Sequence, residues 1–239
     1  MVDCRWRLGE PGAGKRAYLA GHVPGAAFLD VDADLSGKPG ERGRHPLPAA
    51  GDFEAAARRA GISGGSKVVA YGEGAARLWW LLRHLGHPSP AVLDGGLESW
   101  DGPLRTGAEE IPRGDFSARP REDDTVTAEQ ILEADDVTLV DARAPERYRG
   151  DMEPIDPVAG HIPGAVNVPF DQIAPGERFV PPEELRERLP GGPFVAYCGS
   201  GVTSCTVVLA AELGDAGPAR LYPGSWSEWS RRALPVERQ

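Results

Sequence analysis

Short apolar runs alternate with longer mixed segments along this chain. The runs Lys67–Tyr71, Val137–Val140 and Phe194–Tyr197 are four or five residues long and rich in β-branched and aromatic side chains, which is typical of buried strands. Longer segments with helical character, Ala75–Leu85 and Val202–Leu213, follow two of these runs. Strands that alternate with helices predict a mostly parallel sheet covered by helices on both faces, which is an α/β fold.

The chain also repeats itself. Four segments of the first half return, in the same order, in the second half: Asp3–Arg5 as Asp141–Arg143, Gly21–Ala26 as Gly160–Ala165, Val69–Gly72 as Val195–Cys198, and Leu93–Trp100, more loosely, as Leu221–Trp229. Echoes that keep their order indicate a duplicated unit rather than chance similarity. The sequence therefore predicts two related domains in tandem.

The expected boundaries follow from composition. Residues 106–123 are rich in Gly, Pro, Arg and acidic residues and are expected to link a domain of residues 1–105 to a domain of residues 124–239. In the second domain a helix over Glu129–Glu133, with Thr127 as its N-cap, comes before the first strand. Only two residues come before Asp3, so the first domain is expected to lack this opening helix.

Composition narrows the function classes. Hydrophobic residues make up 41% and charged residues 26% of the 239 residues, as in globular proteins, and the net charge of −10 disfavours a nucleic-acid partner. No apolar run is long enough for a bilayer, and the N-terminus has no apolar signal region, so we expect a cytoplasmic protein without a membrane partner. Three cysteines without a CxxC pair suit a reducing compartment, which leaves thiols free for chemistry.

The sharpest chemical signal is the segment Cys198-Gly199-Ser200-Gly201, between a predicted strand and a predicted helix. Glycines allow the backbone to curl so that several N–H groups face one sulfur, and a helix N-terminus adds partial positive charge. Both effects stabilise a thiolate or a persulfide anion. The alternative is that Cys198 is simply a small buried side chain, as we expect for Cys205, but its place in a Gly-rich loop favours a functional thiol.

The loop from Cys198 to Thr203 resembles the active-site loop of 3-mercaptopyruvate sulfurtransferases, which belong to the rhodanese family. The two Gly-His-x-Pro-Gly-Ala turns and the segment Ala75–Trp80 extend the resemblance over nearly the whole chain. It implies two rhodanese domains, the first inactive and the second catalytic, and Gly72 indeed occupies the position that corresponds to Cys198. The sister family of thiosulfate sulfurtransferases typically has a Lys in this loop where the present chain has Ser200.

The resemblance also implies roles for individual residues. Cys198 carries the transferred sulfur as a persulfide, and Arg147 binds the donor carboxylate through its planar guanidinium. Ser200, His45 and Asp32 match a proton relay. The remaining loop residues are expected to contact the substrate: Gly199, Gly201, Val202 and Thr203. Without the resemblance, the residues alone favour a solvated Arg147 and a His45 that packs in its Pro-rich loop.

One position departs from the family pattern. A second substrate-binding arginine usually follows the first by nine residues, but residue 156 is an aspartate. We expect an acid there to repel either donor, and the doubly charged thiosulfate more than mercaptopyruvate. Arg149 and Arg77 are the candidates to replace the missing arginine.

The sequence thus predicts a sulfurtransferase that moves sulfur from 3-mercaptopyruvate to a thiol acceptor, such as thioredoxin or a small thiol, or to cyanide. It is expected to need no cofactor and no metal. Two alternatives stay open at this point. One is a thiosulfate:cyanide sulfurtransferase, and the other is a non-enzymatic rhodanese-like module that carries sulfur or binds a partner.

Overall fold

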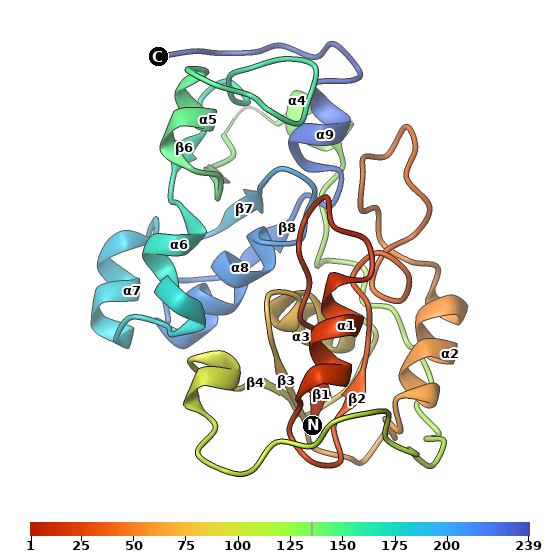
Figure 1. Ribbon diagram of the computed structural model, residues 1–239. Coiled ribbons are helices and arrows are strands. Elements are labelled where there is room, and N and C mark those ends of the chain that lie inside the picture. The colour runs from red at the N-terminus through yellow and green to blue at the C-terminus, as the bar shows by residue number, and fades with distance from the viewer. Residues whose placement is uncertain (135) are drawn as a thin grey trace. The chain divides into compact units, whose positions relative to one another are not determined.

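The computed structural model of the chain describes residues 1–134 and 136–239, which form two compact units (Figure 1). The first unit contains residues Met1–Gly37, Leu47–Arg121 and Gly176–Arg178. The second unit contains residues Lys38–Pro46, Glu122–Pro175 and Phe179–Gln239. Two short segments therefore belong to a different unit from the residues on either side of them in the sequence. Lys38–Pro46 belongs to the second unit, and Gly176–Arg178 belongs to the first.

The first unit is built on a four-stranded parallel sheet. Its strands are β1 (Val2–Asp3), β2 (Ala27–Phe28), β3 (Val68–Tyr71) and β4 (Pro90–Val92), in the spatial order β2-β1-β3-β4. Its helices are α1 (Ala13–Ala20), α2 (Ala50–Arg59), α3 (Ala75–His84) and the 3-10 turn η1 (Gly96–Ser99). Helices α1, α2 and α3 connect successive parallel strands, as such strands require.

The second unit repeats this design. Its parallel strands are β5 (Leu139–Asp141), β6 (Val166–Asn167), β7 (Phe194–Tyr197) and β8 (Ala219–Leu221), in the order β6-β5-β7-β8. Its helices are α4 (Ala128–Glu133), α5 (Pro145–Arg149), α6 (Phe170–Ile173), α7 (Pro182–Arg188), α8 (Ser204–Leu213) and α9 (Ser225–Trp229). The strand order is that of the first unit shifted by four, so the predicted tandem α/β fold is confirmed.

Helices cover both faces of the second sheet. Helices α6, α7 and α8 pack together on one side, and α4, α5 and α9 gather on the other (Figure 1). The core beneath α9 is built around Trp226 and Trp229, which are 0% and 1% exposed and pack with Val195 and Tyr197 of the central strand β7. This core fixes the position of α9, whose N-terminus takes part in the functional site described below.

Some predicted strands and helices have the same ends in the structure, and others begin or end at different residues. Strand β7 matches its prediction, and α4 begins after Thr127, whose hydroxyl accepts a hydrogen bond from Gln130 N while the Gln130 side chain accepts one from Thr127 N. Strand β5 covers Leu139–Asp141 rather than Val137–Val140. Helix α8 begins at Ser204, not at Val202, which leaves a longer loop after Cys198.

Both units contain the same arginine clamp at the end of a strand. Arg143 binds the Asp141 carboxylate with both Nε and Nη2, at 2.6–3.1 Å, and Nη2 also donates to the Gly160 carbonyl at 2.7 Å. Arg5 makes the corresponding bonds to Asp3 and Gly21. A bidentate, buried pair of this kind is among the stronger polar contacts in proteins. It ties the strand end to the Gly-His turn in each repeat.

The histidines of the two turns have matching structural contacts. His22 Nδ1 donates to the Tyr18 carbonyl at 2.8 Å, and His161 Nδ1 donates to the Tyr148 carbonyl at 2.7 Å. Each imidazole also stacks on the ring of that same tyrosine, with ring centroids 4.0 Å and 3.8 Å apart. Because both repeats have these contacts, the histidines serve the turn rather than a reaction.

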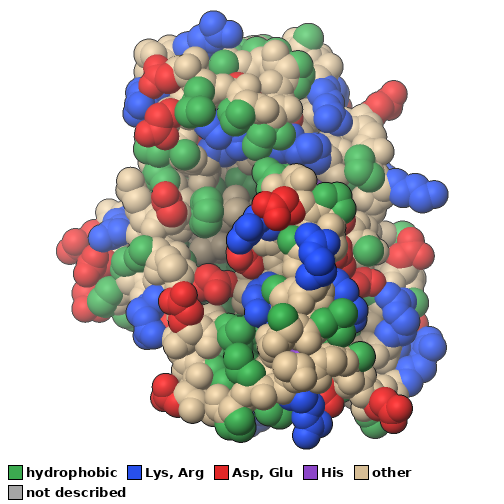
Figure 2. Space-filling model, in the orientation of Figure 1, with side chains coloured by type: hydrophobic (Ala, Val, Ile, Leu, Met, Phe, Trp, Pro, Cys, Tyr) green, Lys and Arg blue, Asp and Glu red, His purple; other side chains and the backbone are tan. Residues whose placement is uncertain are grey.

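The surface carries charges of both signs. Figure 2 shows acidic and basic side chains interspersed over one face of the molecule, so on that face the negative excess is not gathered into one patch. Throughout residues 1–134 and 136–239, no helix has the length and apolar character that crossing a membrane requires.

One half-buried acid belongs to the first unit. Glu177, at the end of the short 3-10 turn η2 (Pro175–Glu177), accepts a hydrogen bond from Gly95 N at its backbone carbonyl, at 2.9 Å. Its carboxylate lies over Gly96 so closely that a Cβ atom at position 96 would come within 2.0 Å of Glu177 Oε2. Burial, followed by the charges of Glu73 and Asp3, raises the pKa of Glu177 from 4.5 to about 7.

We therefore predict that Glu177→Gln changes the pH dependence of stability. Because the folded state holds this proton more tightly than the unfolded state, the cost of the charged form is absent below about pH 4.5 and complete above about pH 7. The variant should raise Tm at pH 8 by about 2 °C, since partial exposure screens the effect, and leave Tm at pH 4.5 nearly unchanged. Glu122→Gln, at an exposed linker position, is the control. An equal pH dependence in wild type and Glu177→Gln would contradict this assignment.

Candidate functional site

The site is built around the loop that joins β7 to α8. Cys198 follows directly after β7 and is only 2% exposed. The loop is held from one side by the start of α9, because Trp226 N donates to the Cys198 carbonyl at 3.0 Å and Ser227 N donates to the Gly199 carbonyl at 2.9 Å. Ser225 Oγ accepts from Cys198 N at 3.2 Å. With its carbonyls bound to α9, the loop can direct other N–H groups towards the sulfur.

Gly201 brings such a group to the thiol. Its N–H donates to Cys198 Sγ at 3.1 Å. The backbone has φ +80° at Gly201, and a Cβ atom there would lie 2.5 Å from the Pro223 carbonyl oxygen, so only glycine fits. The N-terminus of α8 at Ser204 follows closely and adds partial positive charge beside the sulfur.

The surroundings of Cys198 favour a thiolate. Burial by itself raises the pKa of the Cys198 thiol, but hydrogen bonds from the Ser204 and Thr203 hydroxyls and from the backbone N–H groups of Ser200 and Ser204 lower it by more. The net pKa lies below the ordinary value for cysteine. The buried Ser204 hydroxyl has no geometrically defined hydrogen-bond partner in the described part of the chain, so it is available to the sulfur. A buried anion stabilised by several donors is a competent nucleophile.

The other two cysteines have different surroundings. Cys4 is fully buried in the first unit, and burial together with the charge of Asp3 raises its pKa well above the ordinary value. Cys205 is also fully buried, and its S–H donates to the Gly201 carbonyl at 3.4 Å. The expectation that Cys205 packs in the core agrees with this burial. The hydrogen bond from Cys205 to Gly201 also supports the loop that surrounds Cys198.

The structure places His45 beside Ser200. His45 Nδ1 lies 2.7 Å from Ser200 Oγ, and both side chains are buried, at 7% and 6% exposure. Both belong to the second unit, because His45 lies in the segment Lys38–Pro46. Asp32 lies at an exposed position of the first unit, where its backbone N–H donates to Asp30 Oδ1 at 2.9 Å. Participation of Asp32 in a relay therefore stays a prediction.

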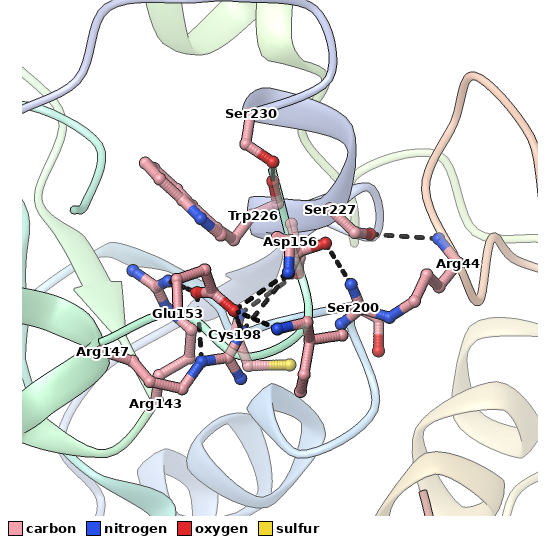
Figure 3. Close-up of polar contacts among 12 residues, drawn as sticks. Arg44, Arg143, Arg147, Glu153, Asp156, Cys198, Ser200, Trp226, Ser227 and Ser230 are labelled. Carbon is pink, nitrogen blue, oxygen red and sulfur yellow. Dashed lines mark hydrogen bonds and ion pairs between the residues drawn. The ribbon is translucent and has the colours of Figure 1, made fainter. Parts of the chain in front are cut away.

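Arg147 also lies at the loop, held by carboxylates (Figure 3). Its Nη2 and Nε donate to Glu153 at 2.6 Å and 3.1 Å, and Nη2 lies 3.3 Å from Asp156 Oδ2. Its Nη1 is directed at the loop, since a Cβ atom at position 199 would lie 3.3 Å from it. Arg143 is 3% exposed, binds Asp141 and lies 4.6 Å from the Trp226 ring centroid, so its contacts are structural.

Asp156 differs from the expectation of a repelling acid. Its side chain is fully buried and forms ion pairs with Arg44 and Arg147. Burial raises the pKa of Asp156, and the charges of Arg44 and Arg147 oppose that rise. An acid whose charge is matched by two guanidiniums presents little net field to a donor, so these ion pairs argue against the expected repulsion.

The two candidate substitutes for a second arginine have other contacts in the structure. Arg149 pairs with Asp151 at 2.8 Å on an exposed part of the chain. Arg77 is fully buried in α3 of the first unit, where its Nε donates to the Leu35 carbonyl at 3.3 Å. A different residue, Arg44, comes close to the loop instead, because a Cβ atom at position 199 would lie 3.1 Å from its Nη2.

The other predicted loop residues lie as follows. Val202 is 3% exposed, and Thr203 is the N-cap position of α8. Sequence reasoning missed five residues that contact the loop or its arginines: Arg44, Glu153, Ser204, Ser225 and Ser227. The repeat of the Gly-Ser-Trp segment near Trp226 was the one available signal, since it marked α9 as part of the duplicated design.

Both halves of the chain match one protein family. The family model of the rhodanese-like domain matches residues 1–102 and 124–232. The chain belongs to the rhodanese family. Each match contains one of the two parallel sheets, so each sheet of this rhodanese lies in one family domain.

Relatives carry two kinds of name. A Pseudomonas aeruginosa protein, provisionally named 3-mercaptopyruvate sulfurtransferase, is 43% identical over 250 residues, which cover 96% of this rhodanese and 88% of the relative. A Mycobacterium tuberculosis protein, provisionally named thiosulfate sulfurtransferase SseB, is 44% identical over 253 residues, which cover 96% and 87%. The two names agree on sulfur transfer and differ in the donor.

A solved structure gives the same picture. The crystal structure of SseA from Escherichia coli, a 3-mercaptopyruvate sulfurtransferase, matches with a TM-score of 0.79 and 32% identity, covering 95% of this rhodanese and 92% of that chain. The prediction of a tandem-domain sulfurtransferase enzyme is therefore confirmed. The alternative of a non-enzymatic module is not supported.

The hydrogen bonds to Cys198 predict the behaviour of Ser204→Ala. Without this hydroxyl the thiolate loses one donor, so the pKa of Cys198 should rise. Alkylation of Cys198 by iodoacetamide at pH 7 should slow by about tenfold, the effect of one hydrogen bond to a charged group. Ser230→Ala is the control, because the buried Ser230 hydroxyl donates to the Trp226 carbonyl instead. The pH profile of alkylation should shift upward only in Ser204→Ala, and an unshifted profile would contradict the assigned bond.

Proposed function

We propose that this rhodanese takes sulfur from 3-mercaptopyruvate onto Cys198 and passes it to a thiol acceptor, such as thioredoxin or a small thiol, or to cyanide. The observation that carries the proposal is the buried Cys198 thiol, whose pKa is lowered by the donors of its own loop. The donor and acceptor are small molecules or exposed thiols, and the reacting atom of each must reach the sulfur carried by Cys198. The names of the relatives support the donor class.

The first half-reaction begins with attack by the Cys198 thiolate on the sulfur of mercaptopyruvate. A sulfur–sulfur bond forms, the carbon–sulfur bond breaks, and its electron pair moves into the carbonyl-conjugated system of the leaving group. Pyruvate therefore leaves as its enolate, which takes up one proton. The thiol proton of the donor balances that uptake, so the products are pyruvate and a Cys198 persulfide anion, with no external oxidant or reductant.

The pair of Ser200 and His45 is suited to moving that proton. Ser200 Oγ and His45 Nδ1 are 2.7 Å apart in a buried setting, where a hydroxyl can pass a proton to the enolate and recover it from the imidazole. Asp32 is proposed to orient His45, as the resemblance implies. The loop donors that lower the pKa of Cys198 would hold the persulfide anion in the same way.

The second half-reaction returns the enzyme to its starting state. An acceptor thiolate attacks the outer sulfur of the persulfide, forms a new sulfur–sulfur bond and releases the Cys198 thiolate. Cyanide would form a carbon–sulfur bond in the same manner and leave as thiocyanate. Because Cys198 is alternately loaded and unloaded, the cycle is ping-pong.

Charge supports mercaptopyruvate over thiosulfate. Three arginines near the loop, Arg44, Arg143 and Arg147, are matched by three carboxylates, those of Asp141, Glu153 and Asp156. A balanced cluster accepts one additional negative charge more readily than two. Ser200 also occupies the place where a cation would assist thiosulfate, and its contact with His45 serves enolate protonation instead. The thiosulfate name of the Mycobacterium relative keeps thiosulfate as the second candidate donor.

We expect the enzyme to release pyruvate from mercaptopyruvate. Its kcat/KM for mercaptopyruvate should exceed its kcat/KM for thiosulfate more than tenfold, and a factor of ten corresponds to about 1.4 kcal/mol in transition-state binding. Ser200→Ala should lower only the mercaptopyruvate rate, by removing the proton path. Ser200→Lys should lower that rate and also raise the thiosulfate rate, because it adds the absent charge. Steady-state rates with both donors measure this. A wild-type preference for thiosulfate would overturn the donor assignment.

A further inference from the structure

Arg44 is brought to the active-site loop by a tight turn of its own segment. Gly40 and Gly43 exchange backbone hydrogen bonds at 3.0 Å and 3.1 Å, and Arg44 N then donates to Ser227 Oγ at 3.1 Å. Gly43 has φ +100°, and a Cβ atom there would lie 2.7 Å from Ser227 Oγ and 2.8 Å from the Gly224 carbonyl. Glycine at 43 is therefore required for this close approach, which fixes the backbone of Arg44 against α9.

Asp156 fixes the other end of the Arg44 side chain. Arg44 Nη1 forms an ion pair with Asp156 Oδ1, while Asp156 Oδ2 lies 3.3 Å from Arg147 Nη2. The Asp156 side chain is fully buried, and the two arginine side chains are 15% and 16% exposed. One buried carboxylate thus orients two guanidiniums that come from distant parts of the sequence.

Both guanidiniums leave a donor directed at the same place. A Cβ atom at position 199 would lie 3.1 Å from Arg44 Nη2 and 3.3 Å from Arg147 Nη1, so the absence of a side chain at Gly199 keeps the space in front of them open. Within the described part of the chain, neither nitrogen has a hydrogen-bond partner, and the buried Arg44 Nε has none either. Unsatisfied cationic donors at a partly buried site point to an anionic ligand.

We propose that Arg44 binds the donor carboxylate together with Arg147, and that Asp156 positions Arg44 for this task. The inference rests on the proposed function, because it assigns the carboxylate of a 2-oxo acid thiol to these two guanidiniums. Gly199 follows the nucleophile directly, so a carboxylate held there lies near the sulfur that Cys198 must attack. Arg44 supplies the second cation in a chain that has an acid at position 156.

The test compares two donors that differ only in the carboxylate. Mercaptoacetone has the same thiol beside the same ketone as mercaptopyruvate but carries no charge. Arg44→Ala should raise KM for mercaptopyruvate about 10- to 100-fold with a smaller effect on kcat, because it removes hydrogen bonds to a charged group. Turnover of mercaptoacetone should stay at the wild-type level, which also shows that the variant is folded. Arg44→Lys should recover part of the loss.

Two further variants complete the design. Asp156→Asn should weaken mercaptopyruvate binding selectively, by freeing the Arg44 side chain, and should spare mercaptoacetone. Arg149→Ala removes an arginine that pairs with Asp151 on the surface, and it should leave KM and kcat unchanged with both donors.

An unchanged KM for mercaptopyruvate in Arg44→Ala, with wild-type enzyme active, would overturn the role of Arg44 alone. An equal loss with both donors would also overturn it, since that result shows a structural function. Wild-type enzyme that releases no pyruvate from mercaptopyruvate would overturn the proposed function, and this inference with it.

Discussion

The direction of two peptide groups in the loop after Cys198 controls the chemistry of the site. In a trans peptide the carbonyl and the following N–H point in opposite directions. The carbonyls of Cys198 and Gly199 are bound by Trp226 and Ser227 at the start of α9, so the N–H that follows each of them faces the other way. The N–H of Ser200 is one of the groups that lower the pKa of Cys198. The buried tryptophan core that holds α9 therefore also holds the thiolate.

The two repeats show which part of the design serves the fold and which part serves the reaction. Both keep the strand-end clamp, as Asp3 with Arg5 and as Asp141 with Arg143. They differ after the central strand. In the first unit the loop runs only from Gly72 to Gly74 before α3 begins, and a Cβ atom at Gly74 would lie 2.8 Å from the Cys4 carbonyl. That tight loop has neither a thiol nor the length to surround one.

Sequence patterns predicted the features that depend on neighbouring residues. The strand Phe194–Tyr197 and the start of α3 at Ala75 follow from local hydrophobic pattern, and the duplication follows from repeated turns. The sequence predicts too early a start for α8, because the hydrophobicity of Val202 does not reveal that the backbone turns towards the sulfur before the helix begins.

The contacts of Arg44 and Arg147 with Asp156 could not be predicted from local sequence patterns. The pairing of Arg44 with Asp156 joins residues 112 positions apart, and no local pattern encodes such a contact. Considered by itself, an aspartate where the family has an arginine predicts repulsion. Its meaning changes only when the fold brings a second cation beside it. Long-range contacts of buried charges are thus the part of the site that requires a structure.

The central claim is that sulfur passes through a persulfide on Cys198. The most direct measurement mixes enzyme with one equivalent of mercaptopyruvate, without added acceptor, and follows pyruvate and intact protein mass over the same time course. The account predicts that pyruvate and a mass increase of about 32 Da, one sulfur atom, appear together and in equal amounts, with the added sulfur mapped to Cys198 and no increase in Cys198→Ser. Pyruvate release without a protein-bound sulfur, or a sulfur on Cys4 or Cys205, would contradict it.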